Sequence, residues 1–140
     1  MGLGLNRIGK TVLIVAVFRE SFWEMKKMKL KQIAQELDAK VVCGGDEWGL
    51  VEIKTIFASD LMSDVLMSDR DDMLVVTSLS TEQSVRSAGI VGAEALLIAN
   101  NKTVSDGMVV LANELEVVLL CTRFPKYETC VKIGKIMEQE

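Results

Sequence analysis

Residues 73–99 read MLVVTSLSTEQSVRSAGIVGAEALLIA, and this stretch decides the fold. It opens and closes with short apolar runs, Met73–Thr77 and Ala95–Ala99, which have the length and continuous hydrophobicity of strands buried on both faces. Between them, Ser80 or Thr81 can cap a helix, because a side-chain oxygen at that place accepts a hydrogen bond from the first helical turn. Buried strands that alternate with helices are typical of a parallel sheet in an α/β domain.

The same alternation continues on both sides of this stretch. Downstream we expect a helix from a Ser105 cap to about Leu115, a strand over 117–121, and a helix over 126–137 with Pro125 near its first turn. Upstream we expect a helix over 30–37, strands over 40–43 and 51–58, and a helix over 60–67 capped by Ser59 or Asp60. The sequence therefore predicts a three-layer α/β fold with a mainly parallel sheet and helices on both faces.

Composition limits the classes of function. The 140 residues are 49% hydrophobic, which suits one domain with a real core. The 16 basic and 20 acidic residues are interspersed and give a net charge of -4, so we expect no nucleic-acid partner. The sequence contains no histidine, which removes imidazole catalysis and most zinc and iron sites; we expect no cofactor.

Three cysteines, Cys43, Cys121 and Cys130, are widely separated and odd in number. This pattern indicates reduced thiols in a cytoplasmic protein, with core packing as their main role. The apolar run Val12–Phe18 is shorter than the roughly 20 residues that span a bilayer and is followed directly by charged residues, so we expect no membrane partner.

Residues 1–27 stand outside the regular pattern, and we treat residues 28–140 as the domain. The first 27 residues are either an added strand, an arm, or a consequence of start-site choice, since Met25 and Met28 are alternative starts.

Within residues 1–27, Gly4–Thr11 reads GLNRIGKT and matches the P-loop pattern Gly-x-x-x-x-Gly-Lys-Thr. A P-loop needs a preceding strand and a following helix, whereas three residues precede this one and a β-branched run follows it. A nucleotide-binding enzyme is therefore the alternative hypothesis.

Five stretches between Met28 and Lys135 together carry a resemblance: 28–37 (MKLKQIAQEL), 44–46 (GGD), 58–65 (ASDLMSDV), 74–77 (LVVT) and 124–130 (FPKYETC). Through them, nearly the whole regular part resembles the DRTGG-domain family. The resemblance implies an accessory or regulatory α/β module, found in some phosphate acetyltransferases and beside CBS domains, and similar in fold to the N-terminal domain of HPr kinase/phosphorylase. Small stand-alone members often accompany iron-only hydrogenase genes. No enzymatic activity is established for the module, so the resemblance implies regulation or ligand sensing.

The chain departs from the motif that names this family. After Thr77 it has Ser78-Leu79-Ser80 where longer members carry Asp-Arg, and after Ala99 it has Asn100-Asn101-Lys102 where they carry Thr-Gly-Gly. The literal Asp69-Arg70 pair lies before a predicted strand and is not the motif pair.

In an open parallel sheet, ligands usually bind beyond the carboxyl ends of the strands. This rule selects eight polar residues: Ser59, Asp60, Ser78, Thr81, Asn100, Asn101, Thr122 and Arg123. Hydroxyls, amides, one carboxylate and one guanidinium suit recognition of a small polar or anionic molecule and are poor equipment for catalysis. The structural alternative is that these residues only cap helices and form turns.

We therefore expect a non-enzymatic regulatory module that binds a partner protein or a small polar effector at its strand-end loops. The apolar composition and the resemblance also predict a homo-oligomer. A ligand-free oligomerisation domain is a further alternative. Asp60 and Asp64, at helical spacing, are expected to form a solvated helix face and not a cation site.

Overall fold

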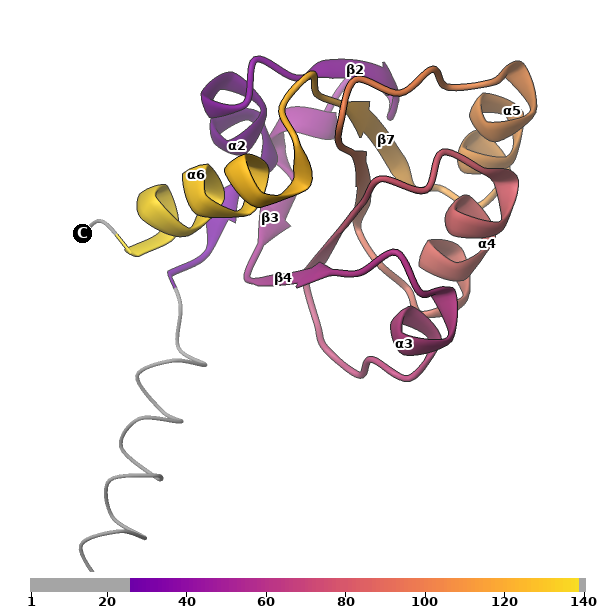
Figure 1. Ribbon diagram of the computed structural model, residues 1–140, viewed down its shortest axis with the longest axis horizontal. Coiled ribbons are helices and arrows are strands. Elements are labelled where there is room, and N and C mark those ends of the chain that lie inside the picture. Colours follow the sequence, from indigo (N-terminus) through magenta and orange to yellow (C-terminus); the bar gives the residue numbers. More distant parts are fainter. Residues whose placement is uncertain (1–25, 139–140) are drawn as a thin grey trace, which may run out of the picture.

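The structure is a computed structural model that describes residues 26–138. Its centre is a five-stranded sheet with the strand order β2-β7-β6-β5-β4 (Figure 1). These strands are β2 (Lys40–Cys43), β4 (Thr55–Ala58), β5 (Met73–Thr77), β6 (Ala95–Ile98) and β7 (Val118–Cys121). Strands β4 to β7 run parallel to their neighbours, and β2 pairs antiparallel with β7 at one edge. The predicted mainly parallel sheet is confirmed.

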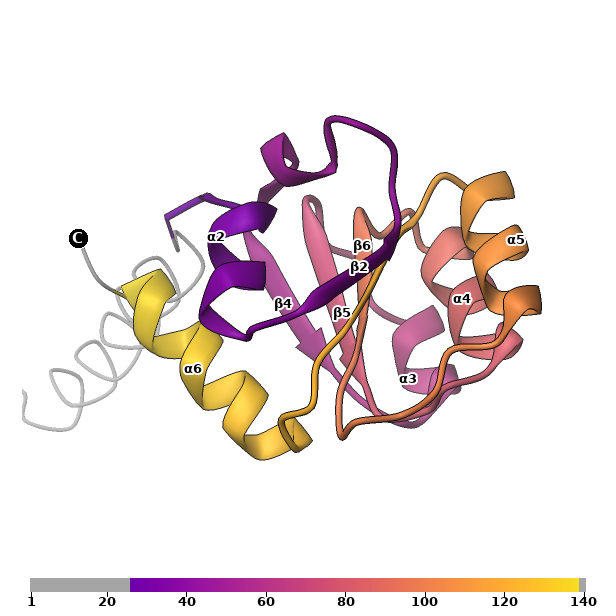
Figure 2. The same ribbon diagram turned by 90° about the horizontal axis from the view of Figure 1, so that it is seen from above.

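Helices cover both faces of this sheet (Figures 1 and 2). One face carries α3 (Met62–Leu66), α4 (Glu82–Ile90) and α5 (Asp106–Glu114), and the other carries α2 (Leu30–Glu36) and α6 (Lys126–Glu138). Successive strand residues supply opposite layers of the core, because side chains alternate along a strand. Val75 packs with α3, α4 and α5, whereas Leu74 and Val76 pack with α2 and α6. The three-layer prediction is therefore confirmed.

Two predicted caps hold their helices as expected. The hydroxyl of Thr81 accepts a hydrogen bond from the Ser84 amide at 3.3 Å and begins α4. The hydroxyl of Ser105 accepts from the Met108 amide at 3.3 Å and begins α5. Each cap satisfies an amide that has no partner within its own helix.

The predicted strand over 51–58 is wrong as a single element, because the chain changes sheets at Lys54. Before it, β3 (Glu52–Ile53) pairs antiparallel with β1 (Met28–Lys29) in a separate two-stranded sheet. After it, β4 joins the main sheet. The Lys54 and Thr55 amides both donate to the Asp72 carbonyl, at 2.8 and 3.2 Å, and this shared acceptor marks the change.

The predicted start of the helix over 60–67 is also wrong. The helix α3 begins at Met62 with Leu61 as its N-cap residue, and no side chain caps it. The Ser59 hydroxyl instead accepts a hydrogen bond from the Leu61 amide at 3.0 Å in the preceding turn. Asp60 cannot act as a cap because its carboxylate bonds to other parts of the sheet edge.

The P-loop pattern Gly4–Thr11 and nearly all of the extension 1–27 lie outside the described residues and stay predictions. At the start of the described part, Lys27 forms ion pairs with Asp72 at 3.1 Å and Glu52 at 3.7 Å. Within residues 26–138, the longest apolar helix falls short of what crossing a membrane requires.

Candidate functional site

The loops that leave β6 and β7 at their carboxyl ends lead to opposite faces of the sheet. The chain goes from β6 to α5 on one face and from β7 to α6 on the other. Where neighbouring parallel strands send their connections to opposite faces, the loops separate, and ligands bind there in open α/β sheets. The loops concerned contain four of the eight predicted site residues: Asn100, Asn101, Thr122 and Arg123.

Asn100 and Asn101 form the loop after β6 and are exposed at this point. Both have left-handed backbone conformations, with φ of 72° and 54°. The Asn100 amide donates to the Phe124 carbonyl at 2.7 Å, and the Asn101 amide donates to the Thr122 carbonyl at 3.0 Å. The backbone is thus fixed to the loop after β7, while the two carboxamide side chains face outward.

Arg123 lies beside these asparagines and makes two weak contacts. Its guanidinium pairs with Asp38 at 3.8 Å, between side chains that are 64% and 80% exposed. It also lies 4.5 Å from the centre of the Phe124 ring. Lys132 of α6 lies 4.8 Å from the same ring centre, so one aromatic ring holds two cations. Lys132 was not among the predicted residues, because no local pattern in α6 links it to a strand end.

Thr122 is 3% exposed and belongs to the core. Its hydroxyl donates to the Leu37 carbonyl at 2.7 Å, a bond that joins the end of α2 to the end of β7. The same oxygen accepts from the Phe124 amide at 3.3 Å. Among the predicted site residues, Thr122 therefore has a structural role that leaves no surface for a ligand.

Asp60 and Ser78 come together at the ends of β4 and β5. The Asp60 carboxylate accepts hydrogen bonds from the Thr77 hydroxyl at 2.9 Å and from the Ser78 amide and hydroxyl, each at 2.8 Å. Lys126 at the start of α6 donates to the same carboxylate. Asp60 thereby connects two strands and the last helix.

These contacts set the pKa of Asp60. Partial burial would raise the pKa, but the hydrogen bonds from Lys126, Ser78 and Thr77 outweigh that effect and hold it well below the usual carboxyl range. The carboxylate is therefore ionised at neutral pH and unsuited to act as a general acid. Asp64 does not join this cluster, and within residues 26–138 no three acidic or cysteine side chains gather as a metal site would require.

A groove opens next to the Arg123–Asp38 ion pair. It lies between α2, β2 and the short helix η1 (Trp48–Leu50), and has a volume of about 540 Å³. Its lining contains both apolar and polar side chains. The lining residues are Lys31, Ala34, Gln35, Asp38, Ala39, Val41 and Trp48. Asp38 lines the groove and also pairs with Arg123, which follows β7. The groove therefore reaches the carboxyl ends of the parallel strands, which we call the carboxyl edge of the sheet.

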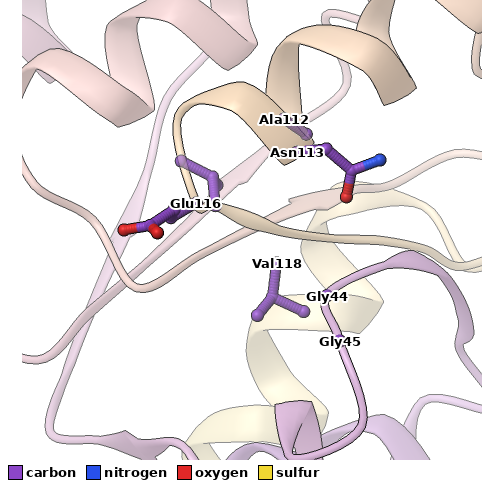
Figure 3. Close-up of a pocket in the computed structure, with 7 residues that line it drawn as sticks. Gly44, Gly45, Ala112, Asn113, Glu116 and Val118 are labelled. Carbon is purple, nitrogen blue, oxygen red and sulfur yellow. The ribbon is translucent and has the colours of Figure 1, made fainter.

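A second pocket lies at the start of β7, at the opposite end of that strand from Arg123, and Figure 3 shows the residues that line it. It has a volume of about 320 Å³ and is bounded by the loop after β2 and by the turn between α5 and β7. None of the eight predicted residues lines it, because all eight follow the carboxyl ends of strands and this pocket lies where β7 begins.

The three cysteines in the described part are free thiols, as predicted. Burial raises the pKa of Cys43, Cys121 and Cys130, so each thiol is protonated and weakly nucleophilic at neutral pH.

Comparisons with known proteins agree with this fold. The family model described as the DRTGG domain matches residues 32–136. Among solved structures, the chain is similar to a crystal structure of the CBS and DRTGG domains of the regulatory region of Clostridium perfringens pyrophosphatase, complexed with its activator diadenosine tetraphosphate. The TM-score is 0.65 at 13% identity, and the match covers 78% of this chain and 47% of that chain. This chain thus spans about half the length of that neighbour, with which it shares the fold. No curated protein matches the chain.

Proposed function

The chain belongs to the DRTGG domain family, and from this premise we propose that it is a non-enzymatic regulatory module that senses a small polar effector at the carboxyl edge of its sheet. The neighbour's DRTGG domain is part of a regulatory region, in a complex with a nucleotide activator. A signal of this kind requires selective binding and no chemical step, since a ligand stabilises whichever state it binds more tightly.

The observation that carries the proposal is the position of Arg123. It stands where the loops of β6 and β7 separate, and its partner Asp38 lines the 540 Å³ groove. An exposed ion pair is weak, so an anionic group of a ligand can replace Asp38 as the partner of the guanidinium. Asn100 and Asn101 supply further donors and acceptors beside it. The groove accommodates the less polar part of the same molecule.

The state of the other polar groups supports sensing over catalysis. Asp60 is an ionised carboxylate already bonded to Lys126, Ser78 and Thr77. General acid–base catalysis needs a group whose pKa lies near the working pH, which this carboxylate is not.

A thermal-shift panel of phosphorylated metabolites tests the proposal, with diadenosine tetraphosphate, ATP and AMP as first members. A ligand that binds only the folded state raises the melting temperature, and the rise grows with the logarithm of the ligand concentration once that concentration exceeds Kd. We expect Arg123→Ala to remove most of that rise, and Arg86→Ala, an exposed arginine on α4, to leave it unchanged. A rise that Arg123→Ala preserves contradicts the proposed site. A rise with ATP and magnesium that Lys10→Ala abolishes would instead favour the P-loop hypothesis.

We also propose that the module self-associates. Large apolar side chains are exposed on both helical layers. Met67, at the end of α3, is 83% exposed, and Ile90, at the end of α4, is 69% exposed. On the other layer, Tyr127 of α6 is 80% exposed. Exposed apolar groups favour protein contacts when they are grouped. Light scattering at high concentration tests this, and a monodisperse 15.4 kDa species would contradict it.

The resemblance to small stand-alone members suggests the cellular setting. We propose a link to hydrogenase or energy metabolism, through a partner protein that the module regulates. The free thiols are consistent with a reducing, cytoplasmic location. Co-purification from the source cells is the test, and recovery of the module without a hydrogenase or metabolic enzyme counts against the link.

A further inference from the structure

The main sheet ends at β4, whose outer side has no neighbouring strand within residues 26–138. The amides of Thr55 and Ser59, at the two ends of this strand, donate to carbonyl oxygens on the β5 side at 3.2 and 3.0 Å. Successive backbone groups along a strand point to opposite sides, so the N–H and C=O groups of Ile56 and Ala58 point away from β5. A further strand can pair with them there.

The two edge strands of the sheet differ in how they are protected. Both have four residues, so their length does not distinguish them. β2 begins with Lys40, and its pairing with β7 shifts register between Val41 and Cys43. Charged side chains and bulges of this kind keep edge strands from joining other sheets. β4 contains no charged residue and no proline, and its register with β5 runs without a shift from Thr55 to Ala58. An unprotected edge strand indicates that protein covers it in the working molecule.

Apolar side chains are exposed on the helix beside this edge. α4 packs against both α3 and α5, so α3 is the outermost helix of its layer, at the β4 end of the sheet (Figure 1). Leu61, which precedes α3, and Leu66 and Met67 at its end are all exposed. Exposed apolar side chains favour contact with protein when they are grouped. We call the outer side of β4, together with these three residues, the β4 edge surface.

We propose that a second copy of this chain covers the β4 edge surface, with its own β4 antiparallel to the first. With a two-fold axis at Phe57, the outward groups of Ile56 in one copy pair with those of Ala58 in the other, and the reverse pair follows by symmetry. This register pairs every outward backbone group of Ile56 and Ala58 in both copies. The inference rests on the proposed self-association and specifies its surface.

Charge and side-chain type favour the antiparallel arrangement. Lys54 precedes β4 and Asp60 follows it, so an antiparallel pair brings opposite charges together at each end. A parallel pair would place Lys54 beside the same lysine of the second copy, where like charges repel. Along the strand, Ile56 packs with the layer of α2 and α6, and Phe57 packs with the layer of α3. Apolar side chains would therefore meet on both faces of the joined sheet.

Hydrogen exchange of single backbone amides in the full chain tests the pairing, at high and at low protein concentration. We expect the Ile56 and Ala58 amides to exchange about tenfold or more slowly at high concentration, because only the dimer gives them hydrogen-bond acceptors. The Phe57 amide faces β5 of its own copy and should be protected at both concentrations.

Ala58→Pro tests the same surface by mutation. Proline is tolerated in an edge strand where the N–H faces outward, but here it removes the outward donor and its ring blocks the second copy. We expect this variant to raise the dissociation constant of the dimer about tenfold or more in analytical ultracentrifugation. Ile90→Lys removes an exposed apolar side chain of α4, away from β4, and should leave that constant unchanged.

The outcomes that would overturn the inference are distinct from those that refute self-association. If the protein self-associates while Ile56 and Ala58 exchange equally fast at both concentrations, self-association is right and the surface is wrong. The same conclusion follows if Ala58→Pro self-associates as tightly as the native chain, or if Ile90→Lys weakens the dimer equally. A monodisperse 15.4 kDa species contradicts both proposals, and protection of both amides in that species would mean that a segment of the same chain covers the edge.

Discussion

Lys126, the first residue of α6, forms an ion pair with Asp60, which lies 66 positions earlier in the loop after β4. This contact ties the last helix to the far edge of the sheet. It also decides how Asp60 responds to pH, because the native state favours the ionised carboxylate.

Asp60→Asn should destabilise the fold at neutral pH and have a smaller effect in acid. The pKa of Asp60 is lower in the folded than in the unfolded state, so its contribution is present above about pH 4 and is lost progressively as the pH falls below that value. Since the side chain is 41% exposed, solvent screening limits the expected cost to about 1 kcal/mol. Urea denaturation of both proteins at pH 7 and at pH 3 measures the difference. Asp64→Asn, on the exposed side of α3, is the control, and an equal loss in both variants would refute the role of the ion pair.

Thr122→Val should destabilise the protein without any ligand present. The substitution keeps the volume of the side chain but leaves the buried Leu37 carbonyl without its 2.7 Å hydrogen bond, at a cost of about 1–3 kcal/mol. Thr122→Ser retains the hydroxyl and should recover most of that free energy of unfolding. Chemical denaturation checks both variants. Unchanged stability of the valine variant would show that this hydrogen bond does not help to hold the end of α2 against β7.

Thr81→Ala should lower the free energy of unfolding by about 1 kcal/mol, since it removes the oxygen that accepts from the Ser84 amide. Thr81→Ser keeps the oxygen and should restore stability. Hydrogen exchange of the amides in the first turn of α4 measures the local effect. If Thr81→Ala leaves stability unchanged yet weakens effector binding, the residue acts on a ligand and not as a cap.

Gly44→Ala and Gly134→Ala should have opposite effects. At Gly44 the new methyl group would meet Val118 at 2.9 Å, and such overpacking costs about 1–3 kcal/mol. At Gly134, in the middle of α6, nothing lies within 4 Å of the new methyl group, so alanine should stabilise the helix by about 0.5–1 kcal/mol. Thermal unfolding of the two variants checks the sign of each change. Stabilisation by Gly44→Ala would mean that the pocket wall is looser than the structure describes.

Patterns within a few residues determined most of the architecture in advance. The apolar runs over 73–77 and 95–98 identified the buried strands, because a strand that is covered on both faces has apolar side chains at successive positions. Ser105 and Thr81 were recognised as caps because a capping bond joins residues three apart. Grouping polar residues at carboxyl ends followed from the direction of parallel strands.

Tertiary structure decided what those residues do. Asp60 appeared to be a cap until contacts with Ser78 and Lys126, 18 and 66 positions away, took up its carboxylate. Thr122 appeared to be a surface residue until α2 covered it. The division of 51–58 between two sheets and the pocket beside Gly44 depend on which strands become neighbours. The chemical type and spacing of side chains are local properties of the sequence, whereas burial, partner and accessibility arise when distant segments pack together.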